Sequence, residues 1–124
     1  MVIALALAVT GVAACNDSVG NVKDFCAAVK QNSKAISDHA VGVGVDNQQI
    51  MTDHVAAYTA ISKKAPSDIK KQTSYIASKQ KKFLEQWKAG GFKTNTMPEF
   101  DEGLGARYQA VDTYVSTNCG VTVT

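Results

Sequence analysis

Four stretches of the chain repeat apolar residues at the spacing of an amphipathic helix. The first begins at Val22, behind the candidate N-cap Asn21, and ends near Ala40. Its apolar positions follow at i+3, i+4, i+7, i+11 and i+14, which predicts one face made of Val22, Phe25, Cys26, Val29, Ser33 and Ile36. The following segment 41–45 alternates valine with two glycines, which favours a loop.

The second and third stretches predict two longer helices separated by Pro66. Asp46 or Asn47 caps the second helix, and Lys63 and Lys64 close it at the negative end of the helix dipole. Its face is Met51, His54, Val55, Tyr58, Ile61 and Ser62. Pro66 stands near the start of the third helix, where proline is tolerated, and 90–91 (Gly-Gly) ends that helix. Its face is Ile69, Thr73, Ile76, Gln80, Phe83, Leu84 and Trp87.

The last helix is predicted to begin at a capping box, in which Thr96 is followed three residues later by Glu99. It ends at Cys119 and Gly120. Its apolar face consists of Phe100, Leu104, Tyr108, Val111 and Val115. Because four amphipathic helices are joined by short loops, the sequence predicts an all-α fold, an antiparallel four-helix bundle over residues 22–120.

The N-terminal segment 1–14 contains no charged residue and forms the one long apolar run of the chain. It is shorter than the roughly 20 residues of a spanning helix and typical of a signal-peptide apolar region. It leads into Val12-Ala13-Ala14-Cys15 and then into the polar segment 16–21. We therefore expect a signal peptide at 1–14 and a tether at 15–21. The alternative is a buried N-terminal helix with an incidental cysteine.

The tetrapeptide that ends at Cys15 resembles the bacterial lipobox, an aliphatic and two small residues followed by an invariant cysteine. The resemblance implies cleavage before Cys15 and a diacylglyceryl group on its sulfur. A signal peptide normally opens with Lys or Arg, whereas the first charge of this chain is Asp17. Either the true start lies upstream of Met1, or the segment is used without that charge.

Three cysteines are an odd number, which in an exported protein leaves one thiol to explain. If Cys15 is lipidated, Cys26 and Cys119 remain as a candidate disulfide in an oxidising compartment. In an up-down-up-down bundle, the start of the first helix and the end of the last lie together. The bridge would close a loop of about 94 residues, worth about 4.5 kcal/mol by chain entropy. Two buried free thiols are the alternative.

Further short motifs extend the similarity. The chain resembles small actinobacterial lipoproteins of unknown function, which show a lipobox, a cysteine early in the first helix, an Ala-Pro-x-x-Ile step and a closing Tyr-Val-x-x-x-Cys-Gly. The matching residues are Cys15, Cys26, the segment 65–69 (Ala-Pro-Ser-Asp-Ile) and the segment 114–120 (Tyr-Val-Ser-Thr-Asn-Cys-Gly). The resemblance implies a helical fold and a place in the cell envelope, and it brings no catalytic residue with it.

The histidines offer few candidates for chemistry. His39 and His54 each follow an aspartate, but adjacent helical side chains point about 100° apart, so neither pair chelates a metal. With no further ligand at a suitable spacing, no metal site and no cofactor are predicted. His54 and Tyr58 share a face at i, i+4. Together with Met51 and Trp87 they are candidates to line a site for a small apolar ligand or haem; alternatively, they fill the interior.

No catalytic residue is predicted. The sequence contains no G-x-S-x-G, no P-loop and no G-x-G-x-x-G. Glu99, Asp101 and Glu102 cluster at the expected start of the last helix, where the helix dipole accounts for them. The chain is therefore not expected to be an enzyme.

Composition and charge limit the classes of partner that the chain is expected to bind. With 45% hydrophobic and 19% charged residues, the 124-residue chain is neither collagen-like nor disordered. A net charge of +2 with a single arginine, Arg107, argues against nucleic-acid binding. The range 63–93 nevertheless holds nine lysines against two acids, a local charge of +7. On the third helix, Lys70, Lys81 and Lys88 fall on one stripe, a candidate contact for anionic lipid or an anionic envelope polymer; the alternative is a solvated face.

These observations predict a lipid-anchored protein at the outer face of the cell membrane, acting as a non-catalytic binding or structural module. The alternative function is a carrier of a small apolar ligand or haem in the bundle interior.

Overall fold

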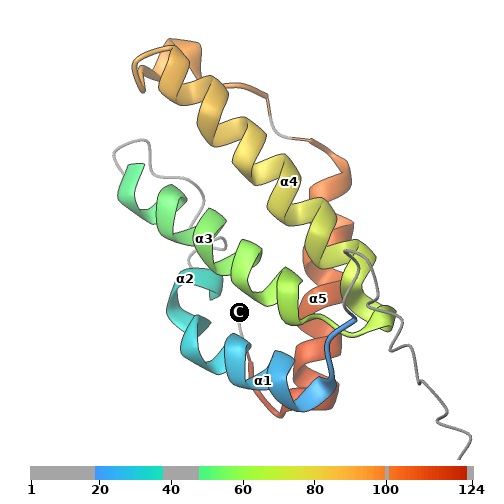
Figure 1. Ribbon diagram of the computed structural model, residues 1–124. Helices are drawn as coiled ribbons and strands as arrows, with labels where there is room; N and C mark the ends of the chain where they lie inside the picture. The colour runs from blue at the N-terminus through green and yellow to red at the C-terminus, as the bar shows by residue number, and fades with distance from the viewer. Residues whose placement is uncertain (1–18, 38–47, 100, 123–124) are drawn as a thin grey trace, which may run out of the picture.

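The helices expected from the periodic pattern form an all-helical domain. A computed structural model describes residues 19–37, 48–99 and 101–122, and no strand occurs among them. The elements are α1 (Val22–Gln31), α2 (Ser33–Ser37), α3 (Gln48–Lys64), α4 (Ser67–Ala89), the 3-10 turn η2 (Thr94–Thr96) and α5 (Gly103–Cys119). α4 packs against α3 on one side and α5 on the other, and α1 packs beneath against α3 and α5 (Figure 1).

The prediction of one continuous first helix is wrong, because the helix breaks at Asn32. The Asn32 side-chain amide donates to the carbonyl of Ala28 at 2.8 Å, and its backbone N–H is shared between the carbonyls of Ala28 and Val29. Asparagine side chains compete in this way with the regular helical ladder. The chain restarts as α2, which still buries Ile36 completely. The expected helix end at Ala40 and the loop 41–45 lie outside the described residues.

The predicted capping box at Thr96 is also wrong. The Thr96 hydroxyl donates to the carbonyls of Lys93 (2.8 Å) and Gly90 (3.1 Å), which closes the turn behind α4 and leaves no cap for a new helix. α5 begins seven residues later, at Gly103, whose N–H donates to Asp101 Oδ1 at 2.8 Å. The carboxylate that caps α5 is therefore Asp101.

The predicted apolar faces form the core. The second helix, α3, buries all six predicted residues, and α4 buries six of its seven, with Leu84 half-buried. Two clusters result. The larger one joins α1, α2, α3, α4 and α5, and the smaller one consists of Met51, Val55, Phe83 and Trp87. Among the predicted face residues that the structure describes, Ser33 and Tyr108 are also half-buried, and Val22 is exposed over 40% of its surface. Phe100 lies outside the described residues.

Cys26 and Cys119 are paired by a disulfide, as predicted. Their Cα atoms lie 5.2 Å apart, inside the 4.4–6.8 Å window of such bonds. Cys26 lies in the second turn of α1, and Cys119 is the last residue of α5. The bond thus ties together the first and last helices of the domain.

The chain enters the domain beside the connection between α3 and α4 (Figure 1). The Gly20 N–H donates to the carbonyl of Ala65 at 3.1 Å. A Cβ atom at Gly20 would lie 1.8 Å from the carbonyl oxygen of Lys64, so no other residue fits there without a shift of the backbone.

Candidate functional site

The most distinctive group of polar side chains is buried between α3, α4 and α5. His54, 2% exposed, bonds through Nδ1 to the carbonyl of Ala35 (2.9 Å) and through Nε2 to the hydroxyl of Tyr108 (2.8 Å). A carbonyl only accepts, so Nδ1 holds the proton in the neutral ring and Nε2 accepts from Tyr108. The Gln80 amide also donates to the Tyr108 hydroxyl. Both ring nitrogens of His54 are therefore engaged within the protein.

Tyr58 lies in the same cluster. Its ring packs 4.8 Å from His54 and edge-on to Tyr108 at 5.4 Å, measured between ring centroids. Its hydroxyl is fully buried and has no hydrogen-bond partner in the described part of the chain. Burial raises the pKa of Tyr58 well above 10.0, and the neighbouring Tyr108 and Asp112 raise it further.

Tyr108 is also held in its neutral form. Burial raises its pKa to about 12; donation from Gln80 acts in the opposite direction, and the negative charge of Asp112 adds to the rise. Both phenols thus keep their protons at neutral pH. Tyr108 therefore acts as a hydrogen-bonding group and Tyr58 as a packing group.

The four candidate ligand-lining residues do not converge. Met51 and Trp87 belong to the smaller cluster with Val55 and Phe83, whereas Tyr58 belongs to the larger one and His54 bonds across to Ala35 and Tyr108. All four are at most 5% exposed. Two surface pockets bounded by described residues include none of them; one is lined by Gln31, Asn32, Lys34, Ala35, Asp53 and Ala56.

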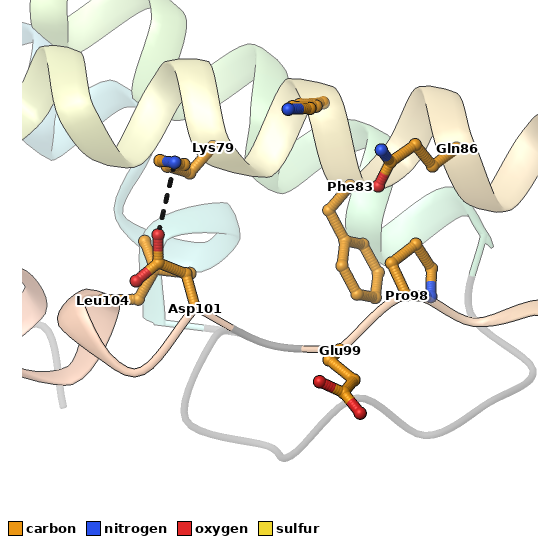
Figure 2. Close-up of a pocket in the computed structure, with 8 residues that line it drawn as sticks. Lys79, Phe83, Gln86, Pro98, Glu99, Asp101 and Leu104 are labelled. Atoms are coloured by element: carbon orange, nitrogen blue, oxygen red, sulfur yellow. Dashed lines mark ion pairs between the residues drawn. The ribbon is translucent and has the colours of Figure 1, made fainter.

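The other pocket lies between α4 and the segment that leads into α5 (Figure 2). Its volume is about 250 Å³, and Phe83, Pro98 and Leu104 form its apolar part. Lys79 and Asp101 close one end with an ion pair of 3.4 Å.

The carboxylate of Asp101 contacts three other groups near the start of α5. It accepts from the Tyr75 hydroxyl (2.7 Å), from the Gly103 N–H (2.8 Å) and from Lys79. The bond from Tyr75, followed by that from Gly103, lowers the pKa of Asp101 below its usual 3.8. Tyr75 also stacks against the Arg107 guanidinium, 4.7 Å from the ring centroid. This group connects α4 to α5, and nothing in the local sequence pattern points to it, because Tyr75 and Asp101 are 26 residues apart.

The stripe of three lysines on α4 is not uniform. Lys70 is half-buried and donates to the carbonyl of Ser62 at the end of α3. Lys81 and Lys88 are exposed. Lys70 therefore contributes to packing between α3 and α4, and the other two face solvent.

Cys15 and His39 lie outside the described residues. Within the described ranges, His, Cys, Asp and Glu side chains form no cluster of three or more that could hold a metal ion. No helix in those ranges is both long enough and apolar enough to cross a bilayer.

The comparisons with known proteins add no relative: no family model, no curated protein and no solved structure matches the chain.

Proposed function

We propose that the chain is an exported, lipid-anchored protein of the bacterial cell envelope. Its helical domain, residues 22–120, acts at the outer face of the membrane as a non-catalytic binding or structural module. The observation that supports this best is the pairing of Cys26 with Cys119. Disulfides form and persist in oxidising compartments, which in bacteria means outside the cytoplasm.

The same pairing makes Cys15 the remaining cysteine. It stands at the end of an uncharged apolar run, in a lipobox-like tetrapeptide. In the proposal, residues 1–14 are removed as a signal peptide, Cys15 receives the lipid, and residues 15–21 are the tether. The resemblance to small actinobacterial lipoproteins supports the same location.

We further propose that the helices of the domain form an antiparallel bundle. Between α3 and α4 the chain has only Ala65 and Pro66, both buried, and these two helices pack against each other. Such a short connection between packed helices favours a reversal of direction.

Nothing in the described part of the chain favours the alternative function, a carrier of a small apolar ligand or haem. Met51 and Trp87 pack in a different cluster from Tyr58, and both nitrogens of His54 are already hydrogen-bonded. We accordingly propose no cofactor for the domain. Its partner is the membrane, with anionic lipid or an anionic envelope polymer as the surface that the domain meets.

The lipid on Cys15 is tested by expressing the full chain in a bacterium that processes lipoproteins. Mass spectrometry of the purified protein should find Cys15 as the N-terminal residue, with a diacylglyceryl adduct. Cys15→Ala should accumulate as the unprocessed precursor, because the peptidase acts on the lipidated cysteine.

The matched control is the double variant Cys26→Ala/Cys119→Ala, which removes cysteines without touching the lipobox and should still be processed. A wild-type protein that keeps residues 1–14, or that has a free Cys15 thiol, would contradict the proposal. A small apolar molecule retained by the protein in native mass spectrometry would favour the carrier instead.

A further inference from the structure

The domain holds the end of the tether in a fixed place. Gly20 donates to the carbonyl of Ala65 and approaches Lys64 so closely that no side chain fits at position 20. Cys15 precedes Gly20 by five residues, and an extended chain of that length reaches about 17 Å. A lipid on Cys15 would therefore keep this end of the domain within about 17 Å of the bilayer.

The surface around this point combines apolar and basic side chains. Val19 is 58% and Val22 40% exposed, and they are the large hydrophobic residues that the described chain leaves exposed. Lys23 follows in the first turn of α1, and Lys63 and Lys64 are exposed in the last turn of α3. We name these five residues the tether surface.

The charge at this end is positive. The two segments that meet here, 19–24 and 63–71, contain five lysines and two aspartates, a net charge of +3. Among these lysines, Lys70 donates from its ammonium group to a backbone carbonyl, that of Ser62. Apolar side chains can enter the interfacial region of a bilayer, and neighbouring lysines are attracted to anionic lipid headgroups.

We propose that the tether surface rests on the headgroup region of an anionic phospholipid bilayer. Val19 and Val22 enter the interface, and the ammonium groups of Lys23, Lys63 and Lys64 contact lipid phosphates. This inference rests on the proposed function, since the lipid on Cys15 brings the surface to the membrane. Contact between the tether surface and the bilayer then fixes the orientation of the domain relative to the membrane.

This placement separates the tether surface from the exposed lysines of α4. At 1.5 Å per residue, Lys81 and Lys88 lie about 20 and 30 Å along α4 from its first residue, Ser67. Exposed charges interact over about 8 Å at physiological ionic strength. Lys81 and Lys88 are therefore well beyond this distance from the tether surface, and they serve as internal controls.

The experiment uses the lipidated protein in two kinds of vesicle, phosphatidylcholine alone and phosphatidylcholine mixed with phosphatidylglycerol. Amine acylation is followed lysine by lysine with peptide mass spectrometry. In the anionic vesicles, labelling of Lys63 and Lys64 should fall about fivefold, the ratio that corresponds to the attraction of one lysine to an anionic surface. High salt should abolish the protection, and labelling of Lys81 and Lys88 should not change.

Two matched variants complete the test. Lys63→Gln/Lys64→Gln should also remove the protection of Lys23, whereas Lys81→Gln/Lys88→Gln should leave it intact. Equal labelling of Lys63 and Lys64 in both kinds of vesicle, or protection centred on Lys81 and Lys88, would overturn the inference.

Intact mass distinguishes this failure from failure of the proposed function. If Cys15 has no lipid, the proposed function is wrong. Binding of the same unlipidated protein to both kinds of vesicle is then measured by flotation. Binding to anionic vesicles that Lys63→Gln/Lys64→Gln weakens about 25-fold still supports the tether surface. No binding overturns both proposals.

Discussion

At the scale of single residues, the buried Tyr58 and the half-buried Tyr108 pack together but differ in the hydrogen bonds of their hydroxyl groups. The Tyr108 hydroxyl bonds to His54 and accepts from Gln80, whereas the Tyr58 hydroxyl has no partner in the described part of the chain. Burying a hydroxyl costs free energy that only a hydrogen bond returns. The two hydroxyl groups are therefore expected to have opposite effects on stability.

Phenylalanine substitutions test this contrast. Tyr108→Phe leaves buried polar groups of His54 and Gln80 without their partner and should lower the free energy of unfolding by about 1–3 kcal/mol. Tyr58→Phe removes the same atom where nothing is bonded to it and should leave stability unchanged or raise it. Urea unfolding at neutral pH measures both, and each variant is the control for the other. A larger loss for Tyr58→Phe would contradict the assignment.

At the scale of helices, the sequence predicts faces better than ends. The buried faces of α3 and α4 follow directly from their 3.6-residue period, because the same period decides which side chains meet the core. The ends depend on single hydrogen bonds. Asn32 breaks the first helix by bonding to Ala28, and Thr96 donates where a helix cap would accept. Neither of these hydrogen bonds can be predicted from the apolar pattern.

The cap of α5 gives a prediction at this scale. Asp101→Asn removes the charge that attracts Lys79 and weakens acceptance from Gly103 and Tyr75, so the first turn of α5 should open more often. Amide hydrogen exchange should become faster in residues 103–107 and stay unchanged in α3. Glu102→Gln is the matched control, because Glu102 is exposed and makes no side-chain cap bond.

The same carboxylate has a defined pH dependence. The pKa of Asp101 is lower in the folded protein than in the unfolded chain, so the unfolded chain takes up its proton first as the pH falls. The stabilisation is present above the usual pKa of 3.8 and is lost as the pH falls through the lowered value. Asp101→Asn should therefore be less stable than wild type at neutral pH and lose less stability on acidification. An equal loss in both proteins would contradict this role.

At the scale of the whole molecule, the sequence predicts the features that depend on the local apolar pattern and on the number of cysteines. The all-helical fold and the pairing of Cys26 with Cys119 are of that kind. The contacts among His54, Gln80 and Tyr108 are not, because they join α3, α4 and α5 over separations of 28 to 54 residues. A sequence pattern places His54 on a buried face, but the partner of each ring nitrogen depends on how three helices pack.

The disulfide constrains most of the chain, because it joins α1 to the end of α5 across 93 residues. Closing so long a loop removes conformational entropy from the unfolded chain, which corresponds to about 4.5 kcal/mol. That is a large part of the 5–15 kcal/mol typical of a folded domain. Cys26→Ala/Cys119→Ala should therefore lower the urea midpoint strongly, and reducing agent should lower that of the wild type while leaving the double variant unchanged. If reduction leaves the wild-type midpoint in place, the bond does not form in the protein, and the argument for export from the paired cysteines fails with it.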